Sequence, residues 1–244
     1  MVDLEVISPN FNDRPDGVVA DSIVLHYTGM RDANEALARM CDAEAQVSAH
    51  YMICENGKIV KMVDEEKRAW HAGVSSWRGR DNVNDFSIGV EIVNTGHEFG
   101  YVPFPDMQMD SVVALCKELA FKFNIAPENV IAHSDIAPTR KLDPGELFDW
   151  KKLADEDLAL YVNLSGVGQN APLFGRGDKD DYIISIKEKL QKFGYGIDVN
   201  DKYDEQMAYV VAAFRRRFVQ HDVNGDVWDS LCDFALNQLI ATTS

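Results

Sequence analysis

One stretch of the chain decides how the rest is organised, and it reads Ile131-Ala-His-Ser-Asp-Ile-Ala-Pro-Thr-Arg-Lys-Leu-Asp-Pro-Gly145. A short apolar run ends here and delivers His133 where a buried strand would run out into a loop. Lys141 and Asp143 follow just before a proline, which favours an extended backbone. Alternate side chains of an extended segment share one face, about 6–7 Å apart, so Lys141 and Asp143 point together while Arg140 points away. The stretch therefore predicts an imidazole, a carboxylate and an ammonium group beside a strand end.

A second histidine supplies what this stretch lacks for a metal site. His26 closes the apolar run Ser22-Ile-Val-Leu-His26, and α/β sheets place their sites at the carboxyl ends of such strands. Taken singly, each histidine would more often be structural, but their occurrence together with Asp143 favours a metal. A His/His/Asp set leaves the fourth tetrahedral position open for water, as catalytic zinc requires, and it contains no structural cysteine ligand. His26, His133 and Asp143 are therefore the predicted ligands of Zn²⁺.

A carboxylate in the middle of another predicted strand would complete a hydrolytic site. In Ser87-Ile-Gly-Val-Glu-Ile92 the branched apolar residues share one face, while Gly89 and Glu91 share the other, with the glycine clearing space. Hydrolysis needs one group that accepts and returns a proton and a cation for the oxyanion, and Glu91 and Lys141 are predicted for these catalytic roles. The alternatives are a solvent-facing glutamate, against which the apolar flanks argue, and a salt bridge from Lys141 to Asp143, which would weaken the ligand.

Four residues are secondary candidates for substrate contacts. Trp70 and His71 lie in a loop, 70–77, that is dense in aromatic and small residues, and such loops often carry function or cover a cleft. For His71, packing within the loop is an equal alternative. His50 lies on a predicted strand, where a structural role is favoured over a substrate contact. Arg140 would add a second cation to the cleft.

The remaining patterns predict an α/β domain with a mixed central sheet flanked by helices. Strands alternate with helices, and Asn56-Gly57 is a strong hairpin signal between two strands. Asp32 begins a capping-box pattern for a helix to about Met40, and Asp106 is predicted to cap a long helix. This domain is expected to span residues 1–160.

A composition shift separates a second, smaller unit from the first. Glycine, proline and polar residues indicate a linker at 161–179. Residues 180–244 are expected to form a small three-helix domain. Its three amphipathic segments are Tyr182–Phe193, Tyr203–Phe218 and Val227–Leu239.

Charge and cysteine usage limit the partners and the compartment. With 24 basic and 40 acidic residues, the net charge of -16 argues against nucleic acid and anionic membranes. No apolar run is long enough for membrane insertion. The four cysteines form no CxxC pair, which favours free thiols and a reducing compartment. Because the first residues look unlike a signal peptide, a cytoplasmic location is expected, or a periplasmic one if a signal peptide had been removed. The oligomeric state is left open.

Several separated motifs between about residues 20 and 155 together resemble one enzyme family. The motifs are Leu25-His-Tyr-Thr-Gly29, Ser48-Ala-His-Tyr51, Ala69-Trp-His-Ala-Gly73, Ser87-Ile-Gly-Val-Glu-Ile92 and the stretch from His133 to Gly145. They resemble the zinc-dependent N-acetylmuramoyl-L-alanine amidases of the amidase-2 family, which share the fold of peptidoglycan recognition proteins, and in particular the AmpD/AmiD-like branch. By position, the resemblance implies His26, His133 and Asp143 as zinc ligands. It also implies Glu91 as the catalytic carboxylate and Lys141 as the group that stabilises the oxyanion.

The C-terminal unit resembles the three-helix peptidoglycan-binding domain. The resemblance is carried by Leu190-Gln-Lys-Phe-Gly-Tyr195, Ala213-Phe-Arg-Arg-Arg-Phe218 and Asn224-Gly-Asp-Val-Trp228. Between its first two helices stands Asp198-Val-Asn-Asp201, where such domains usually have a glycine-rich turn. The alternative is a helical appendage that only packs on the catalytic domain.

The resemblance implies hydrolysis of the amide between the lactyl group of N-acetylmuramic acid, or its anhydro form, and L-alanine of the stem peptide. The expected partner is peptidoglycan or a muropeptide. The C-terminal unit favours polymeric wall, whereas the free cysteines and the absent leader favour a soluble anhydro-muropeptide in recycling, and both stay open. One alternative is a non-catalytic recognition protein of the same fold, a class that typically lacks a metal ligand. Another is a metal-dependent phosphoesterase, against which the few cleft cations argue.

Overall fold

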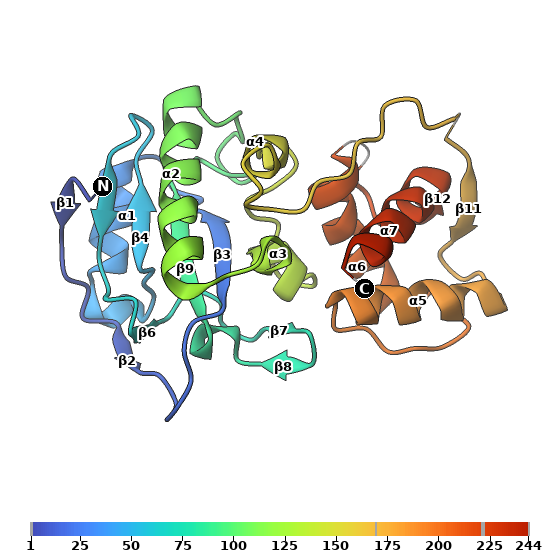
Figure 1. Cartoon of the computed structure of the whole chain (residues 1–244), viewed down its shortest axis with the longest axis horizontal. Coiled ribbons are helices and arrows are strands. Elements are labelled where there is room, and N and C mark those ends of the chain that lie inside the picture. The colour runs from blue at the N-terminus through green and yellow to red at the C-terminus, as the bar shows by residue number, and fades with distance from the viewer. Residues whose placement is uncertain (1, 169, 221–222, 244) are drawn as a thin grey trace.

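A mixed six-stranded sheet forms the centre of the first part of the protein (Figure 1), as the sequence predicts. The computed structural model describes residues 2–168, 170–220 and 223–243. In spatial order the strands are β1 (Leu4–Glu5), β5 (Ile59–Lys61), β4 (Tyr51–Ile53), β9 (Ser87–Ile92), β3 (Ser22–Tyr27) and β10 (Val130–Ala132). Among the described strands of this sheet, only the neighbours β4 and β5, which form the predicted hairpin, are antiparallel. β3, β9 and β10 therefore end at the same edge of the sheet.

The two faces of the sheet have different coverings. The long helix α2 (Asp106–Phe123) packs on the face formed by apolar side chains such as Leu25 and Val90. The opposite face carries the alternate residues, and the parallel register of β3 and β9 sets His26 beside Glu91. Burial of the apolar face, at about 25 cal/mol per Å², is what fixes the register. If the register of these strands shifted by one residue, the side chains of His26 and Glu91 would point into the hydrophobic core.

Short elements complete this part. They are β2 (Phe11–Asp13), α1 (Ala33–Met40), β6 (Lys67–Ala69), β7 (Ser76–Trp77), β8 (Arg80–Asp81), α3 (His133–Ile136), α4 (Trp150–Ala154) and the 3₁₀ turns Ala43–Ala45, Val83–Asp85 and Pro127–Asn129. The predicted cap of α1 is confirmed, because the Asp32 carboxylate accepts from the Glu35 N–H at 2.9 Å.

Two sequence predictions for this part are wrong in detail. Asp106 does not cap α2, because Pro105 occupies the cap position and Asp106 is the first helical residue, where its charge still favours the helix N-terminus. His133 does not enter a loop but begins α3, because the Asp135 carboxylate accepts the Ala132 N–H at 2.9 Å and caps one helical turn.

The C-terminal part contains the three expected helical segments. They are α5 (Asp181–Phe193), α6 (Glu205–Phe214), which continues into a π-helical turn, η4 (Arg215–Val219), and α7 (Ser230–Thr242). The third segment begins later than predicted, because Val227–Asp229 forms a strand, β12, whose Asp229 then caps α7. β12 pairs with β11 (Pro172–Gly175), so part of the predicted linker is a strand of the C-terminal unit. The domain boundaries themselves stay a prediction.

The two parts share a hydrophobic core. Ile131, Ile136 and Trp77 from the sheet part belong to one buried cluster with Phe193 and Phe218 from the helices. Figure 1 shows the C-terminal helices beside α3 and α4. Within the described ranges, no helix has the length and apolar character needed to cross a membrane.

Candidate metal centre and active site

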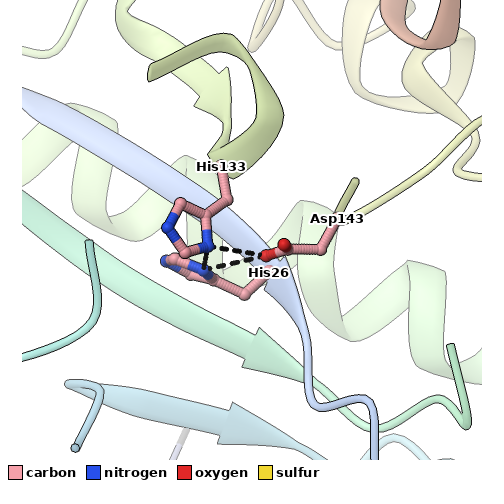
Figure 2. A group of neighbouring side chains, drawn as sticks. All are labelled: His26, His133 and Asp143. Atoms are coloured by element: carbon pink, nitrogen blue, oxygen red, sulfur yellow. Dashed lines mark hydrogen bonds and ion pairs between the residues drawn. The ribbon is translucent and has the colours of Figure 1, made fainter. Parts of the chain in front are cut away.

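The structure brings the three predicted metal ligands together. His26 lies near the end of β3, His133 follows β10 directly as the first residue of α3, and Asp143 lies in the loop beyond α3. The Nδ1 atoms of the two histidines are 2.8 Å apart, and Asp143 Oδ2 lies 3.1 Å from His26 Nδ1 and 2.9 Å from His133 Nδ1 (Figure 2). All three side chains are at least about nine-tenths buried. They meet where parallel strands end, which is where α/β sheets build sites.

The hydrogen bonds of the outer ring atoms assign the tautomers. His133 Nε2 lies 3.1 Å from the carbonyl oxygen of Ala72, which can only accept, so Nε2 carries the proton and Nδ1 presents a lone pair. The assignment for His26 passes through His71, whose Nδ1 lies 3.0 Å from His26 Nε2.

The position of the ring proton of His71 follows from its hydrogen bond with Ser87. Ser87 Oγ donates to the Val83 carbonyl oxygen at 2.6 Å, so it accepts from His71 Nε2 at 3.3 Å. His71 Nδ1 is then the acceptor and His26 Nε2 the donor, which leaves a lone pair on His26 Nδ1. Such outer partners fix the orientation of metal-binding histidines and raise their basicity.

These assignments show that the site fits a cation. Three atoms with lone pairs and no proton converge within 3.1 Å of one another. In tetrahedral protein sites with bond lengths of about 2.0–2.1 Å, neighbouring ligand atoms lie about 3.3 Å apart, close to this spacing. Burial alone would raise the pKa of Asp143, but His133 and His26 hold it well below its ordinary value. Burial and the neighbouring His133 lower the pKa of His26 to about 4. At neutral pH both groups are in the forms that bind a metal.

Glu91 lies next to these ligands with an unused carboxylate oxygen. Its Oε2 atom is buried and has no hydrogen-bond partner among the described residues. Glu91, His133, Lys141 and Asp143 line a cavity of about 170 Å³, large enough for several waters. Burial, and after it the charge of Asp143, raises the pKa of Glu91 well above its ordinary value, while Lys141 acts in the opposite direction. A carboxyl group whose pKa is raised in this way is a better proton acceptor than an ordinary glutamate.

A wider cleft opens from this cavity. It has a volume of about 590 Å³, and its lining includes Thr28, Arg140, Lys141 and Asp143. The Arg140 guanidinium donates from Nη2 to the carbonyl oxygens of Ala72 at 2.8 Å and of Val74 at 2.5 Å. Arg140 therefore lines the cleft and also ties the loop after β10 to the 70–77 loop.

Arg140, one of the four secondary candidates, lines the cleft, and the other three have the following surroundings. His50 is fully buried, with Nδ1 accepting the Gly89 N–H at 2.9 Å and Nε2 lying 3.0 Å from the Lys67 carbonyl oxygen, the kind of surroundings expected for the structural role that the sequence favours. Trp70 donates its indole N–H to Asn12 Oδ1 at 2.7 Å. His71 packs beneath His26 over Gly89, and it also lines the inner cavity together with Glu91. His71 therefore both packs within the site and lines its cavity, so the two alternatives for this residue stay open.

Two further residues line the cleft: Tyr27, which the sequence did not single out, and His97, for which a surface position is favoured over a substrate contact. Tyr27, directly after His26, and His97 both line the cleft, and their Oη and Nδ1 atoms are 2.9 Å apart. His97 also stacks on Tyr101 at 4.4 Å and lies 3.2 Å from a Glu146 oxygen. The sequence favours a surface position for His97, because its glycine-flanked loop gives no sign that it folds back. The only available signal is the position of Tyr27 next to a predicted ligand.

Comparison with known proteins agrees with this geometry. The profile of the Amidase_2 family, described as N-acetylmuramoyl-L-alanine amidase, matches residues 16–146. The chain is 36% identical over 217 residues to N-acetylmuramoyl-L-alanine amidase AmiD of Escherichia coli (strain K12), covering 84% of this chain and 76% of that protein. It is also 36% identical over 164 residues to 1,6-anhydro-N-acetylmuramyl-L-alanine amidase AmpD of Citrobacter freundii, covering 60% of this chain and 86% of that protein.

Solved structures resemble nearly the whole chain. The complex of E. coli AmiD with anhydro-N-acetylmuramic acid-L-Ala-D-gamma-Glu-L-Lys superposes with a TM-score of 0.79 at 29% identity, covering 96% of this chain and 98% of that one. AmpDh3 from Pseudomonas aeruginosa in complex with anhydromuramic pentapeptide gives a TM-score of 0.74 at 26% identity, covering 98% of each chain. The likeness therefore includes the C-terminal part as well as the sheet. With its buried His/His/Asp site, the chain belongs to the Amidase_2 family and is an N-acetylmuramoyl-L-alanine amidase.

Proposed function

We propose that this amidase uses Zn²⁺ to hydrolyse a soluble anhydro-muropeptide. The bond that it cleaves is the amide between the lactyl group of anhydro-N-acetylmuramic acid and L-alanine of the stem peptide. His26, His133 and Asp143 would hold the ion, because two nitrogen ligands and one oxygen ligand with an open position match catalytic zinc. When bound, zinc would supply a Lewis acid that polarises the scissile carbonyl and acidifies the attacking water.

Glu91 carries the proton transfers in this proposal. Glu91 lines the cavity that the metal ligands His133 and Asp143 also line, and its Oε2 atom has no hydrogen-bond partner among the described residues. It takes a proton from the attacking water as the new C–O bond forms at the carbonyl carbon. It returns this proton to the amide nitrogen as the C–N bond breaks, so the carboxyl group ends in its starting state. General acid–base catalysis of this kind contributes about 10²–10⁴-fold.

Lys141 stabilises the charge that develops on the carbonyl oxygen. Its side chain lines both the inner cavity and the wider cleft, so its ammonium group can reach a carbonyl placed between them. The backbone N–H groups of Arg140 and Lys141 both donate to the Ala137 carbonyl oxygen, at 3.0 and 3.1 Å, which fixes the loop that carries the cation. A preorganised donor of this kind contributes about 10²–10³-fold.

The relatives support a soluble muropeptide as substrate. The AmiD and AmpDh3 structures named above hold anhydromuramic peptides, and both cover almost the whole of this chain. A cytoplasmic recycling role remains a prediction, supported by four free cysteines. Fractionation of the native host, with antibody detection of the protein, tests the compartment.

One observation carries the proposal: three lone-pair atoms, with no proton between them, converge beside the unpaired carboxylate oxygen of Glu91. The test uses purified protein stripped with a chelator and reconstituted with one equivalent of Zn²⁺, acting on an anhydromuramyl tripeptide. Mass spectrometry follows the release of free tripeptide. Insoluble peptidoglycan is digested in parallel, and the ratio of the two rates separates recycling from wall cleavage.

Glu91→Gln is the matched variant, because it keeps the shape of the side chain and removes its basicity. We expect it to bind one equivalent of zinc and to lose at least about 10²-fold in turnover. Tripeptide release by Glu91→Gln at the wild-type rate would refute the role of Glu91. Muropeptide binding by the zinc-loaded wild type without any release would favour the non-catalytic recognition protein.

A further inference from the structure

The C-terminal helices reach the metal site through one buried carboxylate, Asp135. This residue is the third of α3, two positions after the ligand His133, and it is 1% exposed. Its Oδ2 atom accepts the Ala132 N–H at 2.9 Å and so caps the turn that begins with His133. The position of the Asp135 side chain therefore decides where the first turn of α3 starts.

That first turn also organises the rest of the site. The Ser134 N–H donates to the Asp143 carbonyl oxygen at 2.9 Å, which joins the turn to the third ligand. The Ala137 carbonyl oxygen, at the end of the turn, accepts the N–H groups of Arg140 and Lys141. One helical turn thus positions two of the three predicted ligands and the predicted catalytic lysine.

Two side chains of the C-terminal part hold Asp135 in place. The Tyr195 hydroxyl donates to Asp135 Oδ1 at 2.7 Å, and Arg217 Nε lies 3.5 Å from Asp135 Oδ2. Tyr195 is 1% exposed and Arg217 is 2% exposed. Arg217 also donates to the Val130 carbonyl oxygen at 2.8 Å and stacks on Trp150 at 3.6 Å, so it contacts the strand that leads to His133 as well.

A buried carboxylate is stable only when its lone pairs are satisfied. The catalytic part supplies the Ala132 N–H, while the hydroxyl and the guanidinium come from residues at least 60 positions later in the chain. Without these partners, it would be energetically favourable for the Asp135 carboxylate to turn toward water, and the cap of α3 would be lost.

We propose that Asp135, Tyr195 and Arg217, here called the α3 clamp, are positioning residues through which the C-terminal helices set the geometry of the metal site. This inference rests on the metal site of the proposed function. It assigns the C-terminal part a role in catalysis that is independent of any binding to the cell wall.

The test compares two tyrosine variants of the full chain. Tyr195→Phe removes the hydroxyl that reaches Asp135. Tyr203→Phe is the matched control, because Tyr203 is equally buried, at 1% exposed, and its hydroxyl donates to the Gly225 carbonyl oxygen at 2.8 Å within the C-terminal part. Each is measured for Zn²⁺ affinity by chelator competition, for Tm with and without Zn²⁺, and for the visible spectrum of the Co²⁺-loaded protein.

We expect Tyr195→Phe to weaken Zn²⁺ binding on the order of 10-fold, to reduce the rise in Tm that Zn²⁺ causes, and to shift the Co²⁺ spectrum. Tyr203→Phe should lower Tm equally with and without Zn²⁺ and leave affinity and spectrum unchanged. Arg217→Lys, which keeps a cation but loses the planar contacts, should weaken Zn²⁺ binding in the same direction.

Equal Tm losses in both tyrosine variants with wild-type Zn²⁺ affinity and spectra would overturn the inference, because the clamp would then be structural only. A wild-type protein that binds no Zn²⁺ would instead overturn the proposed function. The two failures are therefore distinguishable in the same experiment.

Discussion

Replacing Gly89 by alanine tests how far the metal site depends on packing beneath it. A Cβ atom at this position would lie 2.4 Å from Cγ and 2.5 Å from Cδ2 of His71, whereas ordinary contact begins at 3.4 Å. The imidazole therefore has to move by about 1 Å to restore normal contact. Since His71 Nδ1 is only 3.0 Å from His26 Nε2, this shift breaks the hydrogen bond that orients the ligand.

The expected magnitude has two parts. Overpacking of a buried site costs about 1–3 kcal/mol of folding stability. Loss of the partner that orients a histidine ligand costs about 10–100-fold in metal affinity. Gly89→Ala should therefore lower both the Tm of the metal-free protein and the Zn²⁺ affinity.

The assay is chelator competition for Zn²⁺ together with thermal unfolding of the metal-free protein. Gly168→Ala is the matched control, because an added Cβ there meets nothing within 4 Å. It should leave Zn²⁺ affinity unchanged. If Gly89→Ala binds Zn²⁺ as tightly as the wild type, His71 does not orient His26, and the tautomer assigned to His26 loses its support.

Three further predictions concern single side chains. Lys141→Met, of similar length but neutral, should lower kcat by about 10²–10³-fold with zinc content unchanged, and wild-type kcat in this variant would remove Lys141 from the mechanism. Burial alone would raise the pKa of Glu65, but the hydrogen bond from Tyr51 and the Lys61 ammonium lower it to about 2, so Glu65 stabilises the fold above pH 4.5 and this contribution is lost as the pH falls toward 2. Between pH 5 and 2, Glu65→Gln should therefore lose about 2 kcal/mol less folding stability than the wild type, which is measured as a smaller fall in Tm. Parallel Tm curves for the two proteins would refute this. Burial raises the pKa of the Cys116 thiol to about 12, so it should react with a thiol reagent only after unfolding, and fast labelling of the native protein would contradict its burial.

The sequence was most informative where strand ends and side-chain alternation act locally. His26 and His133 each close an apolar run, and the parallel sheet that such runs form brings their side chains together with Asp143. The alternation in β9 likewise predicted that Glu91 shares a face with Gly89. These inferences need only the two-residue period of a strand and the common edge of parallel strands.

The sequence was least informative where a distant segment decides the surroundings of a side chain. Gly89 was expected to clear space beside Glu91, and in the structure the 70–77 loop folds back and places the His71 ring over this glycine. For His50 the sequence favours a structural role but does not name its partners, which are backbone groups of β6 and β9. No local period in the sequence encodes such a return of the chain.

The role of the C-terminal part also could not be read from the sequence. Arg217 belongs to a run of three arginines on an amphipathic helix, a pattern that usually indicates a solvated face. In the structure its guanidinium is buried against Trp150 and Asp135. The π-helical turn at Arg215–Val219 helps to explain the difference, because it changes the angular spacing of the arginines.

Anomalous diffraction at the zinc edge from crystals of the Zn²⁺-loaded protein tests the central claim most directly. The expected result is one strong peak about 2.0–2.2 Å from His26 Nδ1, His133 Nδ1 and an oxygen of Asp143. A peak bound through the Nε2 atom of either histidine, or a peak elsewhere with this site empty, would contradict the assigned tautomers and the metal site built on them.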